Sequence, residues 1–299
     1  MAYDTWMDAR LQRILLDLRV PDIARAKVSA LSGGITNENF LVASGPDRFV
    51  LRVCSKDGEA LGIDRARERR CALIAAKLGL GAEPVAHSRK HRATLSRFID
   101  GRPLTPPAAA RPANLRRVVR SIKICHNGPA FPGTFSPFKT VRAYHALARR
   151  NGVALSREVD RALELMERIE LTLGPCRDKR PCHNDLLAAN LIDDGNTVRI
   201  IDWEYAAMGE PFFDLGNFAV NQKLGPEGLR LLLKEYLGEV RQENLERLEL
   251  HRLASDLREA FWGFAQAGIS RLDFDFNGYA AKHLGRFLRG AISFYGRPS

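Results

Sequence analysis

Hydrophobic and polar positions follow two different periods along this chain, and the change between them divides the sequence into two parts. In residues 26–53, the apolar runs "NFLV" and "RFVLRV" are rich in strand-forming residues and are bounded by the turn signals "SGG" and "SGPD", so three strands are predicted. Residues 63–80 have the pattern of a helix that ends near Gly79 and Gly81, and residues 83–101 predict two further strands. The first part is therefore expected to be a small sheet with one helix.

After a connection rich in Pro and Ala, "DGRPLTPPAAARP", the apolar spacing becomes mainly helical. The predicted helices cover residues 112–127, 138–150, 155–174, 225–270 and 277–295. Residues 190–202 are the exception, because "LI" and "VRII" flank the turn signal "DDGN" and predict a hairpin. The expected fold class is α+β with two lobes, a small β-rich lobe at residues 1–99 and a larger, mainly helical lobe at residues 100–299.

Composition restricts the class of protein. The 299 residues are 45% hydrophobic and 27% charged, as in a globular domain. No apolar run reaches the roughly 18 residues that a membrane span needs, and the amphipathic N-terminal segment is interpreted as a helix and not as a signal peptide. Five cysteines, an odd number in a long chain, favour reduced thiols and a cytoplasmic location.

The net charge of +11 has two interpretations. A basic surface attracts nucleic acid or a membrane, whereas a basic cleft attracts a small polyanion such as a nucleotide. Arg and Lys are scattered along this chain, as in "DRARERR" and "RKHR", and no motif of a nucleic-acid-binding module accompanies them. We therefore expect no nucleic-acid partner. The oligomeric state has no signature in the sequence.

Four residues near the middle of the chain have the types and spacing that phosphoryl transfer needs. His183, Asp185 and Asn190 form the pattern H-x-D-x4-N, and Asp202 follows at the end of the predicted hairpin. The spacing is that of the protein-kinase catalytic loop. Phosphoryl transfer needs a carboxylate that orients the attacking hydroxyl and accepts its proton, together with oxygen ligands for Mg²⁺. The hairpin is expected to bring Asn190 and Asp202 together.

These residues also have an ordinary structural interpretation, in which Asp185 and Asn190 cap turns and Asp202 begins a loop. The kinase interpretation is favoured because the pattern, the hairpin and the small β-rich lobe occur together. Three features of kinases that act on proteins are missing: Leu187 stands where a Lys is common, Glu204 replaces the Gly of D-F-G, and no A-P-E segment follows. A small-molecule acceptor is therefore expected.

The stretch "HNDLLAANLI…IIDWEYAAMGEPFFDLGNFAVN" closely resembles the signature of the choline/ethanolamine kinases, a family of protein-kinase-like small-molecule phosphotransferases related to the aminoglycoside phosphotransferases. The resemblance implies a protein-kinase-like fold with ATP and Mg²⁺ as cofactors. It implies that Asp185 is the catalytic base and that Asn190 and Asp202 hold the metal ion. It also implies structural roles for Asp214 and Asn217, which would anchor the helix that follows them.

The same resemblance implies a nucleotide site. The residues implied to contact the nucleotide are Gly34, Thr36, Asn37, Arg52, Glu68, Arg97 and Ile99. Taken alone, the turn that contains Gly34 is an ordinary hairpin turn. Arg52 stands where protein kinases place a phosphate-binding Lys, so it is counted with the catalytic residues, and Glu68 on the following helix is its expected ion-pair partner. Arg97 and Ile99 would meet adenine through backbone groups.

A helical, aromatic-rich segment near the C-terminus resembles the part of choline kinases that binds the ammonium group. The residues implied to contact the acceptor are Asp185, Glu204, Tyr205, Glu259, Trp262 and Tyr279. Trp262 and Tyr279 match aromatic residues of the family, whereas Glu259 stands in the place of another Trp. Aromatic faces favour a quaternary ammonium, and a carboxylate favours a primary ammonium. Phe261 or Phe264 is an alternative source of a further aromatic wall.

The expected function is ATP- and Mg²⁺-dependent phosphorylation of the hydroxyl of a small amino alcohol, choline first and ethanolamine second. The alternative enzyme is a kinase of another small cationic alcohol, such as an aminoglycoside. The alternative from a different class is a catalytically silent module that binds a nucleotide or a nucleic acid. The presence of Asp185, Asn190 and Asp202 together argues against this silent module.

Overall fold

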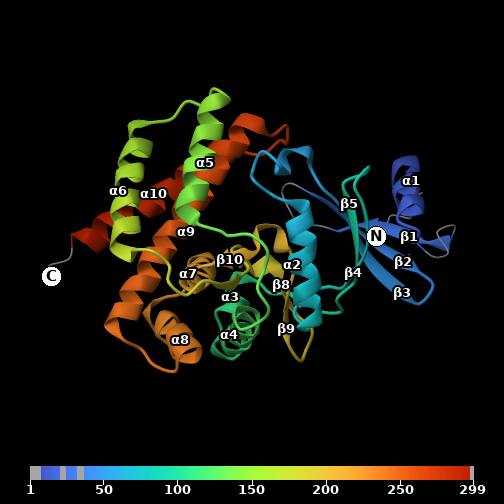
Figure 1. Ribbon diagram of the computed structural model, residues 1–299, viewed down its shortest axis with the longest axis horizontal. Helices are drawn as coiled ribbons and strands as arrows, with labels where there is room; N and C mark the ends of the chain where they lie inside the picture. Colours follow the sequence, from blue (N-terminus) through green and yellow to red (C-terminus); the bar gives the residue numbers. More distant parts are fainter. Residues whose placement is uncertain (1–7, 21–24, 32–36, 297–299) are drawn as a thin grey trace.

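The computed structural model describes residues 8–20, 25–31 and 37–296. Its first part contains a five-stranded antiparallel sheet with the strand order β1-β2-β3-β5-β4 (Figure 1). The strands are β1 (Lys27–Ala30), β2 (Glu38–Ser44), β3 (Asp47–Val53), β4 (Pro84–Ser88) and β5 (Ala93–Arg97). The strands predicted in this part of the chain are therefore confirmed.

Strand β3 shows how the sheet separates its own core from a charged residue. Phe49, Leu51 and Val53 are buried and pack in one hydrophobic cluster with helix α1 (Ala9–Asp17). Because successive side chains of a strand point to opposite faces, Arg52 points away from this cluster. It faces the side on which the helical part of the molecule lies. The alternation therefore supplies one cation to the space between the sheet and the helices.

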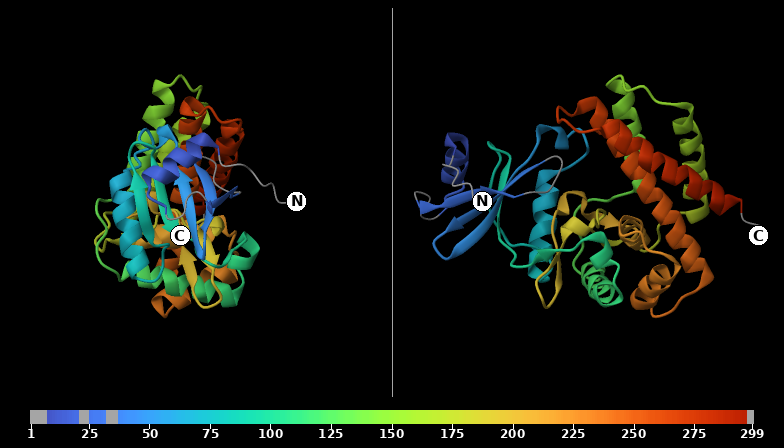
Figure 2. Two further views of the ribbon diagram at one scale, coloured as in Figure 1. Left: turned by 90° about the vertical axis from the view of Figure 1, so that its right-hand side faces the viewer. Right: turned by 180° about the vertical axis from the view of Figure 1, so that it is seen from behind.

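Helix α2 (Arg65–Lys77) begins at an N-cap, where the Asp64 carboxylate accepts hydrogen bonds from the N–H groups of Ala66 and Arg67. The views in Figures 1 and 2 place α2 between the sheet and the helical part. Its buried residues Cys71 and Ala75 share a hydrophobic cluster with residues of the helical part. Helix α2 thus connects the two parts by packing, and a division of the chain at residues 99 and 100 stays a prediction.

The second part of the chain is mainly helical. Its helices are α3 (Pro106–Ala109), α4 (Pro112–His126), α5 (Pro137–Arg150), α6 (Arg157–Leu173), α7 (Pro211–Asn221), α8 (Pro226–Leu237), α9 (Gln242–Ile269) and α10 (Phe276–Tyr295). The long helix α9 packs against α5, α7 and α10, and it carries an almost continuous series of buried residues. Helix α9 is therefore the main support of this lobe.

Two features of the helical lobe differ from the sequence prediction. Residues 225–270 were predicted as one helical stretch, but α8 ends at Gly238, which has a φ of 86° that favours glycine, and α9 starts only at Gln242. Helix α7 was not among the predicted ranges. It is short and buried on nearly all sides, so it lacks the amphipathic spacing by which a surface helix is predicted.

Short strands flank the predicted residues Asp185, Asn190 and Asp202 in the chain. The predicted hairpin is confirmed as β8 (Leu191–Asp193) and β9 (Val198–Ile200), and β8 also pairs with β6 (Arg102–Pro103). A second pair joins β7 (Arg180–Cys182) to β10 (Ala207–Gly209). The short 3₁₀ turns are η2 (Lys56–Gly58), η3 (Ala188–Asn190) and η4 (Trp203–Tyr205). Together with the sheet and the helices, these elements form the two-lobed α+β fold that was predicted.

None of the helices in residues 8–20, 25–31 and 37–296 has both the length and the apolar composition that crossing a membrane requires. The five cysteines of the chain are free thiols, and four of them are buried.

Candidate active site

The loop that contains Asp185 is held in place by a buried carboxylate of α7. Asp214 Oδ1 accepts a hydrogen bond from the backbone N–H of Asn184 at 2.6 Å, and its Oδ2 accepts one from the N–H of His183 at 2.8 Å. The same Oδ2 lies 2.9 Å from Nε2 of His126, on α4. Asp214 and His126 are each 1% exposed. One buried carboxylate therefore holds the loop through hydrogen bonds that are shielded from water.

Asn217 holds the next residue of the loop. Its Oδ1 accepts a hydrogen bond from the backbone N–H of Leu186, and its Nδ2 donates to Oγ of Ser255 at 3.0 Å. Helix α7 approaches α9 closely because Gly216 has no side chain. A Cβ at Gly216 would lie 2.6 Å from the backbone carbonyl carbon of His251. Asp214 and Asn217 thus lie inside α7 and anchor the loop before it, whereas they were expected to anchor the helix after them.

His183 connects the loop to the end of the β8–β9 hairpin. One ring nitrogen, Nε2, lies 3.0 Å from the carbonyl oxygen of Ile201, and the other, Nδ1, accepts a hydrogen bond from the N–H of Asp185 at 3.2 Å. A neutral ring that carries its proton on Nε2 satisfies both contacts. Asn190 completes the turn, because its Nδ2 donates to the carbonyl oxygen of Asp185 at 3.0 Å and its own carbonyl oxygen accepts from Ile201. Asn190 Oδ1 is the amide oxygen left to bind a cation.

Asp202 follows the hairpin in a left-handed backbone conformation, with φ 70° and ψ 62°. This conformation is unfavourable for a non-glycine residue, and such residues cluster at functional sites. The Asp202 carboxylate forms two parallel bonds with Arg52 of β3, both at 2.5 Å. Burial is the largest single effect on the pKa of Asp202 and raises it, but the charge and hydrogen bonds of Arg52, with the charges of His183 and Arg65, together lower the pKa below its usual value. The expected partner of Arg52, Glu68, lies 3.5 Å away as a second, weaker contact.

Glu204 lies in this same cluster and not with the aromatic residues of α9 and α10. Its Oε2 accepts a hydrogen bond from Arg65 at 3.0 Å, and Arg65 also binds Glu68 at 2.7 Å. Burial, reinforced by the charge of Asp202, raises the pKa of Glu204 to about 7. The structure places Glu204 beside Asp202 and the Arg65–Glu68 pair, and its predicted contact with the acceptor stays a prediction. Glu204 and Tyr205 lie in the 3₁₀ turn after Asp202 and point to different neighbours, Glu204 to Arg65 and Tyr205 to Arg258.

The oxygen atoms of this cluster match the ligands that Mg²⁺ prefers. Carboxylate oxygens of Glu68, Asp202 and Glu204 lie within 4.8 Å of one another. Asn190 is bonded to the residue before Asp202, because its backbone carbonyl oxygen accepts a hydrogen bond from the N–H of Ile201. Mg²⁺ takes hard oxygen ligands and keeps several waters, so one carboxylate and one amide oxygen are a sufficient protein contribution. The residues present fit a magnesium ion, with Asp202 and Asn190 as the proposed ligands.

The structure describes only some of the other residues that were predicted to contact the nucleotide. Gly34 and Thr36 lie outside the described residues. Asn37 is described, and its Oδ1 accepts a hydrogen bond from the N–H of Ser55 at 3.2 Å. The N–H of Arg97 donates to the carbonyl oxygen of Glu83 at 2.8 Å, so this N–H is used within the sheet. Ile99 lies beyond the end of β5, and its proposed contact with adenine stays a prediction.

A residue that was not predicted, Arg258 of α9, lies against the proposed base. Its Nη2 is 2.6 Å from Oδ1 of Asp185, and the same nitrogen contacts Oε1 of Glu259. Glu259 also accepts a hydrogen bond from the hydroxyl of Tyr279 at 2.7 Å. Burial raises the pKa of Asp185 to about 6, and Arg258 limits this rise. Asp185, Arg258, Glu259 and Tyr279 therefore form one connected polar group, buried at Arg258 and Glu259 and partly exposed at Asp185 and Tyr279, which we call the acceptor cluster.

The aromatic residues beside the acceptor cluster form a corner and not a closed cage. The rings of Trp262 and Tyr279 are 5.5 Å apart at an angle of 69°, and both side chains are partly exposed. Tyr205 was expected to supply a third wall, but the guanidinium carbon of Arg258 lies 5.0 Å from the centre of its ring. Two rings and one carboxylate are thus available to an ammonium group.

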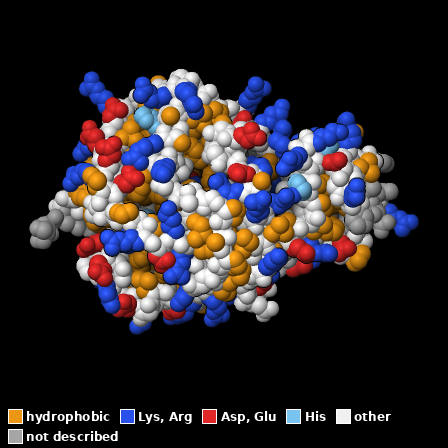
Figure 3. All heavy atoms as spheres, viewed as in Figure 1, with side chains coloured by type: hydrophobic (Ala, Val, Ile, Leu, Met, Phe, Trp, Pro, Cys, Tyr) orange, Lys and Arg blue, Asp and Glu red, His pale blue; other side chains and the backbone are white. Residues whose placement is uncertain are grey.

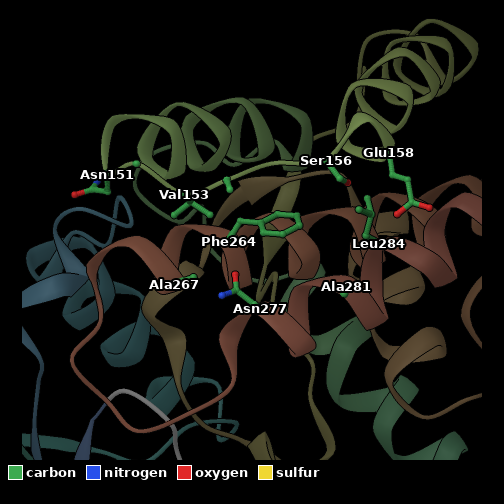
Figure 4. A pocket seen from close by; sticks show the side chains of 11 residues that line it. Asn151, Val153, Ser156, Glu158, Phe264, Ala267, Asn277, Ala281 and Leu284 are labelled. Carbon is green, nitrogen blue, oxygen red and sulfur yellow. The ribbon is translucent and has the colours of Figure 1, made fainter.

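Phe264 faces a separate cavity, which removes it from the acceptor side. This cavity, of about 430 Å³, lies between the α5–α6 connection and helices α9 and α10 (Figure 4). Figure 4 shows the Phe264 ring on its wall and Asn277 and Val153 beside it. Phe261 is fully buried and packs edge-on against Phe264 at 5.9 Å. Neither Phe261 nor Phe264 therefore completes the corner formed by Trp262 and Tyr279.

A two-lobed fold with an H-x-D-x4-N loop in its helical lobe defines a kinase of the protein-kinase-like class. Residues 27–251 match the phosphotransferase enzyme family, and the chain belongs to that family and is a small-molecule kinase. The chain is 25% identical over 262 residues to protein LicA of Haemophilus influenzae, and the alignment covers 81% of this chain and 76% of LicA. It is 27% identical over 310 residues to probable ethanolamine kinase A of Dictyostelium discoideum, with 90% and 88% of the two chains covered.

A solved structure has the same arrangement. The crystal structure of a choline/ethanolamine kinase family protein from Mesorhizobium loti superimposes with a TM-score of 0.77 and 25% sequence identity. The superposition covers 98% of this chain and all of the other. The likeness therefore extends over both lobes, including helices α9 and α10.

Proposed function

We propose that this protein transfers the γ-phosphoryl group of ATP to the hydroxyl of a small amino alcohol, choline before ethanolamine. The observation that carries the proposal is the position of Asp185, whose carboxylate lies in the acceptor cluster while its backbone carbonyl is bound by Asn190. One residue thus connects the proposed metal ligand to the proposed acceptor site. The similarity to LicA, to a probable ethanolamine kinase and to a choline/ethanolamine kinase family structure supports this acceptor class.

The chemistry follows from the charges of the site. Asp185 orients the acceptor hydroxyl and accepts its proton as the oxygen attacks phosphorus. Arg52 has the planar, two-pronged donor geometry that suits phosphate oxygens, and Glu68 lies close enough to hold it when it leaves Asp202. When bound at Asp202 and Asn190, Mg²⁺ would neutralise the negative charge of the phosphates.

The acceptor side supports a small cation. Asp185, Glu259 and Arg258 together carry one net negative charge when all are ionised, which a cationic amino alcohol would neutralise. Trp262 and Tyr279 offer two aromatic walls for the diffuse charge of a trimethylammonium group. Glu259 offers a carboxylate that a primary ammonium would prefer. Choline is proposed first because the two rings are partly exposed, whereas both oxygens of Glu259 already accept a hydrogen bond.

The alternatives receive less support. An aminoglycoside acceptor would need a larger and more acidic surface, and the acceptor cluster has a single net negative charge. A nucleic-acid-binding module would need a continuous basic surface. On the face shown in Figure 3, basic and acidic side chains are interspersed. We also propose a cytoplasmic location, which the five free thiols support.

A comparison of acceptors tests the proposal. ADP formation is measured with Mg²⁺–ATP and, in turn, choline, ethanolamine, an aminoglycoside or no acceptor, and the phosphorylated product is identified by mass spectrometry. The proposal predicts phosphocholine as the fastest product and phosphoethanolamine as the second. Asp202→Ala is the control that distinguishes this activity from a contaminating kinase. Faster phosphorylation of the aminoglycoside, or no phosphorylated alcohol at all, would contradict the proposal.

A further inference from the structure

Arg258 occupies a position that the proposed function does not explain. Its side chain is 2% exposed, and it lies between two carboxylates that belong to the acceptor cluster. Nη2 contacts Oδ1 of Asp185 at 2.6 Å and also contacts Oε1 of Glu259. Its guanidinium carbon lies over the ring of Tyr205, 5.0 Å from the ring centre. One buried cation is therefore shared by the proposed base and by the carboxylate nearest the acceptor's ammonium group.

A requirement of the fold alone does not account for an arginine here. A buried ion pair contributes little net stability, and an apolar residue of similar volume often stabilises a core as well or better. In addition, Nε of Arg258 is buried without a hydrogen-bond partner among the described residues, and an unsatisfied buried donor destabilises a fold. Arg258 thus lowers the stability of the fold, and it lies at the carboxylate of Asp185, the proposed base.

We propose that Arg258 is a positioning residue, which holds the Asp185 carboxylate so that one oxygen is engaged and the other faces the acceptor hydroxyl. This inference rests on the proposed function. Among the described residues, Oδ1 of Asp185 is bound by Arg258, and Oδ2 has no hydrogen-bond partner. A carboxylate fixed through one oxygen presents the second in one orientation, and orientation of reacting groups is a large part of catalysis.

Arg258 also connects the base with the binding of the acceptor. When a cationic amino alcohol lies beside Glu259, that carboxylate has a second cation to neutralise it. The guanidinium of Arg258 then interacts more strongly with Asp185, because Glu259 attracts it less. Acceptor binding would in this way strengthen the ion pair between Arg258 and Asp185. The expected signature is a loss of turnover, and not of acceptor affinity, when Arg258 is replaced.

The test compares Arg258→Met, which removes the charge, with Arg258→Lys, which keeps it. Arg252→Met is the matched control, since Arg252 lies on the same helix and pairs with Glu249 outside the acceptor cluster. Arg258→Met should lower kcat by about 30-fold or more while the KM values for ATP and acceptor stay within about threefold. Arg258→Lys should recover at least about a third of wild-type kcat, because an ammonium also donates to both carboxylates. Equal kcat for Arg258→Met and Arg252→Met would overturn the proposal.

A second comparison covers the case in which Arg258→Met fails to fold because it leaves two buried carboxylates unpaired. Arg258→Met combined with Glu259→Gln removes one negative and one positive charge, so the cluster keeps its net charge. The double variant is compared with Glu259→Gln alone. The proposal predicts that the double variant folds and that its kcat stays at least about 30-fold below that of Glu259→Gln. Similar kcat in the two would show that Arg258 only balances charge.

The same variants are assayed for ATP hydrolysis without an acceptor. In this reaction a water oxygen attacks the γ-phosphorus, its proton passes to Asp185, and ADP and inorganic phosphate are released. Arg258→Met should lower this rate in parallel with the kinase rate. If the wild type phosphorylates neither choline nor ethanolamine, the proposed function is wrong, yet the hydrolysis rates still decide the role of Arg258. An unchanged hydrolysis rate in folded Arg258→Met would overturn the positioning role.

Discussion

Arg52 and Asp202 form a bidentate ion pair across the space between the two lobes, with Nη1–Oδ1 and Nη2–Oδ2 distances of 2.5 Å each. Asp202 is a proposed metal ligand, and Arg52 is a proposed phosphate ligand. A cation that binds Asp202 must therefore compete with Arg52. Each partner would become available to Mg²⁺–ATP when the pair opens.

This competition gives the first prediction. Asp202→Ala should weaken Mg²⁺–ATP by about tenfold or more, because a metal ligand is lost. Metal-free ATP should bind as well as before or better, since Arg52 is released for the phosphates. Calorimetric titration with both forms of ATP measures the difference. Arg52→Met is the companion variant and should weaken both forms. Equal losses for the two forms in Asp202→Ala would show that Asp202 has a structural role only.

The second prediction concerns the pH dependence of turnover. Burial raises the pKa of Asp185 to about 6, with Arg258, Glu259, His183 and Asp202 as its charged or titratable neighbours. Because Asp185 accepts a proton, only its ionised form is active. Activity should be complete above this pKa and fall as the pH decreases through about 6. The profile of kcat/KM for the acceptor against pH should bend there, and a bend near pH 4, the ordinary range of an Asp, would contradict the assignment.

The third prediction concerns the support of the loop. Asp214→Asn keeps the shape of the side chain but replaces one acceptor oxygen by an N–H₂ group, which faces donors at His183 and His126. The variant should lose about 2–3 kcal/mol of unfolding free energy, because buried donors lose their acceptor. Denaturant unfolding measures the loss. The control is Asp178→Asn, an exposed residue that pairs with Arg180 and should change stability by less than about 0.5 kcal/mol.

Much of the fold was predictable because its signals are local. The strands of the small sheet, the hairpin after Asn190 and most helices follow from apolar spacing and turn residues. Helix α7 was missed because it is buried on nearly all sides, and the break at Gly238 was missed because the apolar spacing continues on both sides of it. Packing of this kind depends on neighbours that are distant in the sequence.

The candidate site shows the same limit. Asp185, Asn190 and Asp202 were recognised from their spacing, but the surroundings of Glu204 were not, because the direction of its side chain depends on the 3₁₀ turn after Asp202. Arg258 was overlooked, although the charged pair Arg258–Glu259 directly before the apolar run "AFWGF" was a visible signal of a buried ion pair. Arg65 had no such signal, because it is one of several arginines in "DRARERR".

The fourth prediction decides between the two amino alcohols. Trp262 and Tyr279 form the aromatic corner, so Trp262→Ala should raise the KM for choline by about tenfold, the equivalent of about 1.4 kcal/mol. Ethanolamine should be affected less, because its ammonium group donates hydrogen bonds to a carboxylate. The ratio of kcat/KM for choline and ethanolamine, measured in the wild type and in the variant, isolates this effect. An unchanged ratio would mean that the corner does not bind the ammonium group.

The fifth prediction tests the central claim, that Asp185 is the base for transfer of a phosphoryl group to an amino alcohol. The measurement is a single turnover of γ-labelled ATP with choline, in the wild type and in Asp185→Ala, with the labelled product and the Mg²⁺–ATP affinity followed in parallel. If Asp185 is the base, the wild type forms labelled phosphocholine, and in Asp185→Ala the rate of phosphoryl transfer is lower by about 10² or more. The affinity for Mg²⁺–ATP is nearly unchanged. A rate close to that of the wild type in Asp185→Ala would contradict this claim.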